Sequence, residues 1–416
     1  MFRGRRAAVL LTCVMGPALL QQACTRAWPE TPSSVLSPSS NPPELASSEL
    51  ETPVASSSAS ALASGSAAPA TSALPEVDTA LSHTGRMLAG LVESEASLPK
   101  LDRALKQHRK ACVGHVEAFD KSIGEPLASW AKTELGDQPG ETVFYPFSGP
   151  DLLTAYKFFP AANRYVLVAV QDGGAPPDLS KIQTHEAEET LEMYERILGG
   201  FTRRGFFLTA AMGKGYGGSA TPRGITGVLM MFAELAGLQV LDVLPVRVKA
   251  DGSDLEVHPG DRKDPATWAS VRLELRRRSD GAKVLVDYAN INLANIALSA
   301  NEPATRWMAS MAKGRVLVKA ASHLMQQPDF FTIRDLLLEN AKVIVQDETG
   351  IAYKQLAGKF DVDLYGDFKA VNVLFDNGPQ RALREAYEKR TDVKPLTFNI
   401  GYRKGGKSCL QVGRKH

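Results

Sequence analysis

Residues 144–151, which read FYPFSGPD, combine turn-forming residues with side chains that can bind a polar group. A strand is expected to end within this stretch and a helix to begin after it. Backbone amides at such a junction can hold an anion, and Asp151 could bind a hydroxyl group. We therefore take Ser148, Gly149 and Asp151 as candidate ligand-binding residues. The alternative is a rigid turn in which Asp151 only caps the helix.

Asp172 follows the next expected strand and is a further candidate. In nucleotide-binding strand–helix–strand units an acid at this place binds ribose, but this chain has only one glycine of their fingerprint. If the protein is an enzyme, Asp151 and Asp172 should converge in a pocket with perturbed pKa values. Ser148 does not lie in a G-x-S-x-G motif, so the sequence assigns no catalytic nucleophile.

A glycine-rich stretch at residues 213–224 carries Lys214 and Arg223, and no Asp or Glu occurs between residues 196 and 233. Such a basic stretch could bind an anionic group, which makes Lys214 and Arg223 candidate ligand-binding residues. The alternative is a surface loop whose charges pair with the acidic residues 186–195. The stretch lacks the G-K-[ST] ending of a phosphate-binding P-loop.

The histidines and cysteines do not predict a metal site. The chain has seven histidines, and His185-Glu186 lacks the second histidine of an H-E-x-x-H motif. Cys112 and Cys409 show no C-x-x-C spacing; in an oxidising compartment they are a candidate disulfide. Two buried thiols are the alternative, because cysteine is among the most buried residue types. The sequence identifies no cofactor.

Residues 1–23 have the anatomy of a secretory signal, with a basic start, an apolar run at residues 7–20 and Ala23 before Cys24. The apolar run is shorter than the ~20 residues needed to span a bilayer. Ala23-Cys24 resembles the lipobox of bacterial lipoproteins, in which the cysteine is lipidated, although Gln21 stands where that family prefers Leu. The resemblance implies an outer-membrane lipoprotein. Cleavage without lipidation, giving a soluble periplasmic or secreted protein, is the alternative.

Residues 24–77 are rich in Ser, Ala and Pro. This composition cannot bury enough apolar surface to offset the entropy of ordering, so we expect a disordered tether. The net charge of +2 says little about partners. The lack of a basic motif with interleaved aromatic residues, together with the expected export, argues against a nucleic-acid partner. The expected partners are a membrane, through the lipid anchor, and an anionic or polar ligand.

Beyond the tether, the sequence predicts a helical segment at residues 78–135 and a mixed domain at residues 136–416. The fold class is α/β or α+β, with a parallel strand–helix–strand first half and a second half rich in antiparallel hairpins. Cys112 belongs to an apolar helical stripe and should face the core. The expected elements are strands at 143–147 and 165–171 around a helix at 152–158, helices at 185–198, 225–237, 306–325 and 379–389, and hairpins at 271–275 with 284–291, 343–345 with 351–355, and 397–403 with 408–412.

Three blocks, residues 144–151, 345–351 and 398–402, resemble recurring blocks of an uncharacterised family of exported bacterial proteins. The resemblance spans residues 140–412 and implies one folded unit, but no activity, cofactor or catalytic residue. Two functional hypotheses remain. The first is a non-catalytic, lipid-anchored envelope protein that binds a ligand or partner. The second is a hydrolase or transferase that acts on an envelope glycan or another polar substrate.

Overall fold

The computed structural model describes residues 79–96, 98–136, 139–181, 183–207, 224–258, 264, 267–368, 380–402 and 408–416. The expected signal, the lipidation site Cys24, the tether, Lys214 and Arg223 lie outside these residues. The chain divides into Met1–Val77 and Asp78–His416, so the helical segment 78–135 belongs to the same unit as the sheet. In the described residues, no helix is long and apolar enough to cross a membrane.

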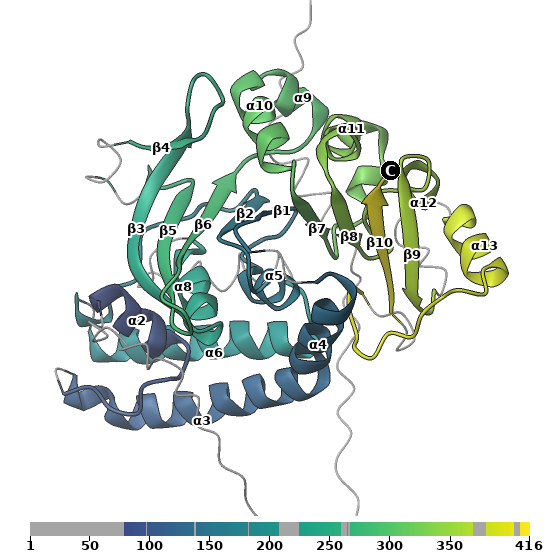
Figure 1. Ribbon diagram of the computed structural model, residues 1–416. Helices are drawn as coiled ribbons and strands as arrows, with labels where there is room; N and C mark the ends of the chain where they lie inside the picture. Colours follow the sequence, from purple (N-terminus) through teal and green to yellow (C-terminus); the bar gives the residue numbers. More distant parts are fainter. Residues whose placement is uncertain are drawn as a thin grey trace, which may run out of the picture. The chain divides into compact units, whose positions relative to one another are not determined.

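A ten-stranded sheet forms the centre of this unit (Figure 1), with the strand order β4-β3-β5-β6-β2-β1-β7-β8-β10-β9. The five central strands, from β6 to β8, run parallel. Antiparallel strands flank them on both sides. The strands are β1 (Thr142–Pro146), β2 (Arg164–Ala169), β3 (Leu238–Val248), β4 (Leu255–Val257), β5 (Val271–Arg277), β6 (Lys283–Asn290), β7 (Arg315–Val318), β8 (Val343–Gln346), β9 (Phe360–Gly366) and β10 (Cys409–Lys415).

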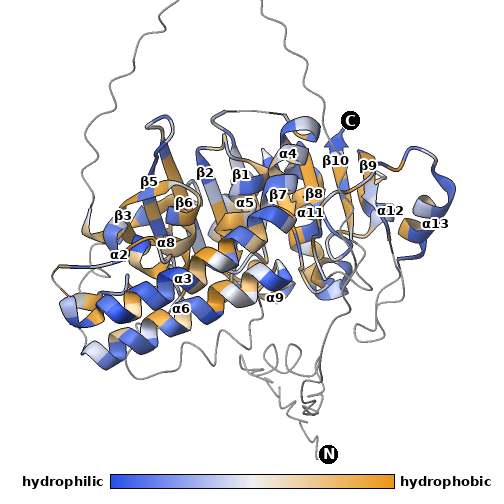
Figure 2. Ribbon diagram, turned by 90° about the horizontal axis from the view of Figure 1, so that it is seen from below, coloured by the Kyte–Doolittle hydropathy of each residue, from blue (hydrophilic) through white to orange (hydrophobic). Residues whose placement is uncertain are grey.

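Helices cover both faces of the sheet and enclose two hydrophobic cores. One face carries α2 (Ala80–Leu88), α3 (Asp102–Phe119), α4 (Glu125–Glu134), α5 (Leu152–Phe158), α6 (Thr184–Arg204) and α8 (Thr226–Leu235). The other carries α9 (Asn295–Ser299), α10 (Glu302–Met311), α11 (Phe331–Asn340), α12 (Tyr353–Leu356) and α13 (Arg381–Lys389). A π-helical segment, Asp120–Gly124, joins α3 to α4, and short 3-10 helices occupy Pro99–Leu101, Leu179–Lys181, Leu324–Gln326 and Pro328–Phe330. Figure 2 shows α3 and α6 side by side, with hydrophilic and hydrophobic residues mixed along both.

The burial of each strand follows from its place in the sheet. In β2 every residue from Tyr165 to Val168 is buried, as a parallel strand covered on both faces requires. In β5 fully buried residues alternate with partly exposed ones, the pattern of an antiparallel strand with one face toward the core. In α3 Leu105, Cys112 and Phe119 are buried, so the expected apolar stripe faces the core.

The mixed α/β class is confirmed, as are the parallel β1–α5–β2 unit and the β5–β6 hairpin. The helix expected at residues 306–325 is wrong after Met311, because Arg315–Val318 form strand β7 between β1 and β8. Gly314 separates the two elements. The run Val316-Leu317-Val318 is stabilised more by pairing and burial in the centre of the sheet than it would be in a longer helix.

Two of the expected hairpins do not form. Residues 351–355 do not pair with β8, because the Gln346 side chain binds both the N–H and the carbonyl of Ile351 and turns the chain toward α12. Residues 409–412 of the expected hairpin fall in β10, but β10 pairs with β8 and β9 instead of residues 397–402. Both corrections replace a local pairing with one between strands far apart in the chain.

The connections diverge between β1 and β7, which are neighbours in the sheet. The chain leaves β1 through α5 on one face and returns as β2 on one side. It leaves β7 through α11 on the opposite face and returns as β8 on the other side. In open α/β sheets, ligands bind beyond the carboxyl ends of the strands at such a switch point.

Candidate functional site

The turns that follow β1 and β7 contain every non-glycine residue with positive φ in the described part of the chain. These are Phe147 at 59°, Ala320 at 50°, Ser322 at 51° and His323 at 57°. Side chains with a Cβ rarely adopt this left-handed region, and each such residue costs about 1–3 kcal/mol. Strained backbone of this kind persists only where the surrounding structure holds it, and it is concentrated at functional sites.

A buried ion pair joins the β1 turn to the β7 turn. Lys319 follows β7 and Asp151 caps α5, and the Lys319 Nζ lies 2.6 Å from Asp151 Oδ2 with side chains only 2% and 1% exposed. The ammonium group also donates to Thr154 Oγ1 at 3.1 Å and to the Gly205 carbonyl at 2.5 Å. All three ammonium hydrogens are therefore used, and Lys319 braces three segments.

Asp151 has more partners than a helix cap needs. Its Oδ1 accepts from the Thr154 N–H at 3.2 Å, which is the cap itself. Its Oδ2 also accepts from the Tyr145 hydroxyl at 3.1 Å. Burial, followed by the neighbouring Asp151 charge, raises the pKa of Tyr145 well above its usual value. Tyr145 is thus a fixed donor. Asp151 caps α5, but it also binds Tyr145 and Lys319, so the cap is only one of its roles.

Asp347, which follows β8, joins the β7 turn to the β8 turn. Its buried carboxylate accepts from the Ala320 N–H at 2.8 Å, the Thr349 N–H at 2.9 Å and the Thr349 Oγ1 at 2.5 Å. Burial raises the pKa of Asp347, and the bonds from Thr349 and Ala320 oppose that rise. A carboxylate that accepts three hydrogen bonds is favoured in its charged form, so these bonds offset part of the effect of burial.

Glu348 is the uncharged neighbour of Asp347. Burial, followed by the Asp347 charge, raises the pKa of Glu348 to about 8. The Cys409 thiol donates to Glu348 Oε2 at 3.4 Å, and burial raises the pKa of Cys409 well above its usual value. At neutral pH this corner therefore contains a protonated carboxyl group and an unreactive thiol.

The segment before residue 403 completes the site. Gly401 has φ 66°, and a Cβ added there would lie 2.5 Å from Asp347 Oδ2, so the two segments are in close contact. The Tyr402 hydroxyl donates to the Ala320 carbonyl at 2.9 Å. Having given its only hydrogen to Ala320, it accepts from Ser322 Oγ, also at 2.9 Å. Burial raises the pKa of Tyr402 to about 12.

The structure brings together only part of the predicted set. Ser148, Gly149 and Asp151 lie in the β1 turn at the switch point, with Ser148 5% exposed and Gly149 at φ 54°. Asp172 is exposed after β2 and accepts from Asn290 Nδ2 at 2.8 Å. Asp151 and Asp172 thus have different partners, and the pair of carboxylates expected for an enzyme does not form. Lys214 and Arg223 lie outside the described residues.

Cys112 and Cys409 are free, buried thiols, so of the two alternatives the disulfide is not formed. Cys112 lies in α3 with its Sγ 3.5 Å from His108 Nε2. Cys409 lies at the start of β10 beside Glu348. The physical reason is that the two cysteines lie on different elements, Cys112 beside His108 in α3 and Cys409 beside Glu348 at the start of β10.

The residues through which the site meets solvent are uncharged. Phe147, Gly149, Ala320, Ser322 and Tyr402 are partly exposed, whereas the charged braces beneath them are buried. The Phe206 ring contacts Tyr402 edge-on, with centroids 4.9 Å apart. The site can therefore offer hydroxyl groups, backbone polar groups and aromatic surface to a ligand.

The contacts among the described residues do not include an activated nucleophile. The Ser148 hydroxyl donates to the neighbouring Gly149 carbonyl at 2.8 Å and contacts no base. The Lys319 ammonium is saturated, and Cys409 stays protonated. No group of three or more His, Cys, Asp or Glu side chains in the described part of the chain could hold a metal ion.

The sequence predicts the β1 turn of this site but not the β7 turn, Asp347 or Tyr402. Residues 345–351 and 398–402 stand out as blocks in the sequence, but no sequence pattern links them to Ser148. The β7 turn, with Lys319, Ser322 and His323, was hidden inside an expected helix. The available signal is the run Val316-Leu317-Val318 after Gly314, which has the composition of a strand and is followed by Lys319.

No family model matches the chain, and no curated protein or solved structure matches it either.

Proposed function

We propose that this chain is an exported, lipid-anchored envelope protein that binds a small polar ligand beyond the carboxyl ends of β1, β7 and β8. Export and lipidation at Cys24 rest on the signal anatomy of residues 1–24. The single observation that supports the ligand site is the placement of all four left-handed, non-glycine residues of the described chain in the two turns at the switch point. Such strain is retained where it serves a site.

The buried braces explain how the strained turns keep one conformation. Lys319 ties the β7 turn to α5 and to the end of α6, and Asp347 ties it to the β8 turn. A site held in advance loses little conformational entropy when a ligand binds. The Lys319–Asp151 pair carries no net charge, and Glu348 is protonated at neutral pH. The exposed groups favour an uncharged polar ligand with one apolar face.

The same contacts favour binding over catalysis. Hydrolysis or group transfer needs an activated nucleophile or a positioned acid and base. Here the buried carboxylates and the lysine bind one another or the backbone, and Asp172 is bound to Asn290. The accessible hydroxyl groups of Ser322 and Tyr402 form a chain that ends on a carbonyl, which suits hydrogen bonding to a ligand.

A thermal-shift screen of the purified whole chain tests the ligand site. Suitable probes are N-acetylglucosamine and uridine, since each is uncharged and combines polar groups with an apolar face. A ligand at 100 times its Kd stabilises the folded state by about 2.7 kcal/mol. Unfolding roughly 340 residues has an entropy of about 0.7 kcal/mol/K, so Tm should rise by about 4 °C.

Two serine variants make the screen specific for this site. Ser322→Ala removes a hydroxyl group that is partly exposed at the site. Ser310→Ala removes one from α10, where Ser310 Oγ donates to the Trp307 carbonyl. Ser322→Ala should reduce the shift by half or more at the same ligand concentration, while Ser310→Ala leaves it unchanged. Equal shifts in both variants, or no shift with any probe, would contradict the proposal.

Metabolic labelling with a palmitate analogue tests the anchor. The wild-type chain, produced in a Gram-negative host, should carry the label and fractionate with membranes. Cys24→Ala removes the acceptor thiol, so this variant should lose both properties while still being exported. An unlabelled wild-type chain in the soluble periplasmic fraction would show that the signal is cleaved without lipidation.

A further inference from the structure

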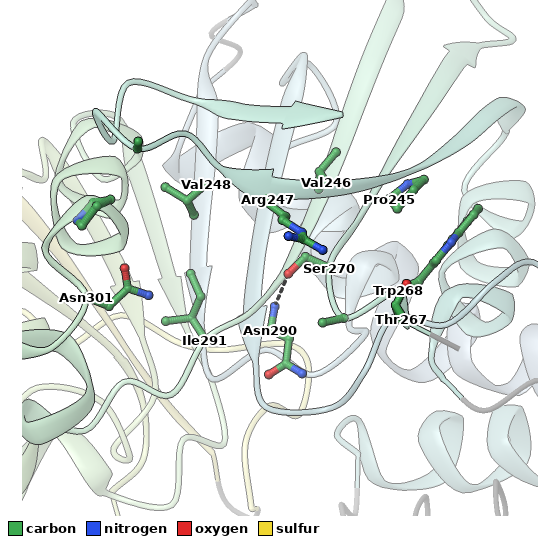
Figure 3. Close-up of a pocket in the computed structure, with 13 residues that line it drawn as sticks. Pro245, Val246, Arg247, Val248, Thr267, Trp268, Ser270, Asn290, Ile291 and Asn301 are labelled. Atoms are coloured by element: carbon green, nitrogen blue, oxygen red, sulfur yellow. Dashed lines mark hydrogen bonds between the residues drawn. The ribbon is translucent and has the colours of Figure 1, made fainter. Parts of the chain in front are cut away.

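A cavity lies away from the site at β1, β7 and β8, between β3, the start of β5 and the end of β6 (Figure 3). Its volume is about 450 Å³, within the ~300–1,000 Å³ typical of small-molecule sites. The strands that border it are not those of the site at β1, β7 and β8. Its polar lining consists of Arg247, Thr267, Trp268, Ser270, Asn290 and Asn301.

The side chains come from four different segments and converge on one space. Figure 3 shows the Arg247 guanidinium group extending from β3 toward Ser270, with Trp268 standing at one end. Asn301, which caps α10, lies at the other end. Val246, Val248 and Ile291 add apolar surface between them. A cavity with an apolar base and a few convergent polar groups has the form of a ligand site.

Hydrogen bonds fix the walls of this cavity. The Trp268 and Ala269 carbonyls accept from the N–H groups of Gly174 and Gly173 at 2.7 and 2.8 Å. Ser270 Oγ accepts from the Asn290 N–H at 2.9 Å. Behind the lining residues Ala250 and Pro303, the Arg306 side chain donates to the Asp251 carbonyl at 3.2 Å. The cavity is therefore held open by contacts that do not involve a ligand.

Asp172 has a role here as a positioning residue. It accepts from Asn290 Nδ2 at 2.8 Å, which fixes the plane of the amide and sets its Oδ1 as an acceptor on the other side. An amide has both donors and acceptors, and binding one of its donors to Asp172 makes its orientation definite. This contact gives a structural use to one of the residues that the sequence singled out.

The chemistry of the lining selects a class of ligand. Amide and hydroxyl side chains donate and accept, which matches the hydroxyl groups of a sugar. Trp268 is only 8% exposed, so its indole adds a small apolar contact at one end of the cavity for the C–H groups of a pyranose ring. The guanidinium group of Arg247 matches a carboxylate or a phosphate. Among the described residues, those that line the cavity include no Asp or Glu, and Arg247 is the one that carries a charge.

We propose that this cavity binds a pyranose sugar that carries an acidic group. Arg247 holds the carboxylate or phosphate, Trp268 packs against the ring, and Ser270, Asn290 and Asn301 bind the hydroxyl groups. Glu256 stands opposite Arg247 in the β3–β4 ladder and is not among the described residues that line the cavity. The proposal does not depend on the function proposed for the site at β1, β7 and β8.

Isothermal titration calorimetry on the whole chain tests this inference. Glucuronate and glucose 6-phosphate are the acidic probes, and glucose is the neutral comparison. At least one acidic sugar should bind ten times or more tightly than glucose, and the tighter of the two tells whether the acidic group is a carboxylate or a phosphate. No binding of either acidic sugar at 10 mM, or equal binding of glucose, would overturn the proposal.

Charge variants locate the binding. Arg247→Gln should weaken the acidic sugar at least tenfold, because a charge-assisted hydrogen bond is lost, while Arg103→Gln on the exposed face of α3 leaves it unchanged. Glu256→Gln removes a negative charge beside Arg247 and should tighten binding. Ser322→Ala should have no effect, which separates this cavity from the other site. Unchanged binding in Arg247→Gln would refute the assignment.

Discussion

Replacing Lys319 with methionine removes the charge that braces the two strained turns. Methionine keeps most of the side-chain volume, so the packing is little changed. The Asp151 carboxylate would then remain buried with only the Tyr145 hydroxyl and the Thr154 N–H as partners. Breaking a buried ion pair by removing one member costs about 3–5 kcal/mol, because the other charge is left uncompensated. The three lost hydrogen bonds are part of that cost.

Urea denaturation followed by circular dichroism measures this cost. Lys319→Met should lower the free energy of unfolding by about 3–5 kcal/mol. Lys106→Met is the control, because Lys106 is exposed on α3, and changes at such positions stay within about 0.5 kcal/mol. The double variant Lys319→Met/Asp151→Asn removes both charges and should lose less stability than Lys319→Met alone.

The double variant separates the ion pair from simple packing. If the main cost is the uncompensated Asp151 charge, neutralising Asp151 restores part of the stability, since a pair of buried charges often contributes little net energy. A loss below about 1 kcal/mol for Lys319→Met would refute the reasoning. A double variant whose loss of stability, relative to the wild type, equals the sum of the losses in Lys319→Met and Asp151→Asn would also refute it.

Three further changes test the same region by urea denaturation. Because burial raises the pKa of Glu348 to about 8 from an ordinary value near 4.5, the folded chain holds a proton that the unfolded chain releases between these values. Stability should therefore fall by a few kcal/mol, roughly, as pH rises from 5 to 8, and Glu348→Gln should flatten this dependence; an equal slope in both proteins would contradict the raised pKa. Ala320→Gly should raise the free energy of unfolding by up to about 1 kcal/mol, because glycine adopts φ 50° without strain, and a loss of stability would argue against strain there. Gly401→Ala should cost over 1 kcal/mol, roughly, more than Gly237→Ala, since both glycines have positive φ but only an added Cβ at Gly401 meets Asp347; equal losses would contradict the close contact.

The sequence predicts those parts of the fold that depend on local patterns. The β1–α5–β2 unit follows from short apolar runs around a capped helix, and the β5–β6 hairpin follows from alternation around a Ser-Asp-Gly turn. The buried run in β2 already indicates a strand covered on both faces. In each case the residues that decide the structure are neighbours in the chain.

The candidate site could be predicted only in part, because its contacts join distant segments. The β1 turn, with Ser148 and Asp151, is visible as a local motif. Its partner Lys319 follows another strand, β7, and the apolar run of β7 does not indicate that β1 and β8 are its neighbours in the sheet. Asp347 and Tyr402 likewise acquire their roles from Ala320. Pairing across the sheet, which no local pattern encodes, decides what these residues do.

Hydrogen exchange of the whole chain tests the central claim most directly. It would be measured with and without the neutral probe that gives the largest thermal shift. We predict slower exchange in peptides that cover the β1 turn, residues 147–151, and the β7 turn, residues 319–323, and loss of that protection in Ser322→Ala. Protection confined to other segments, or the same protection in Ser322→Ala, would contradict a ligand site at the ends of β1, β7 and β8.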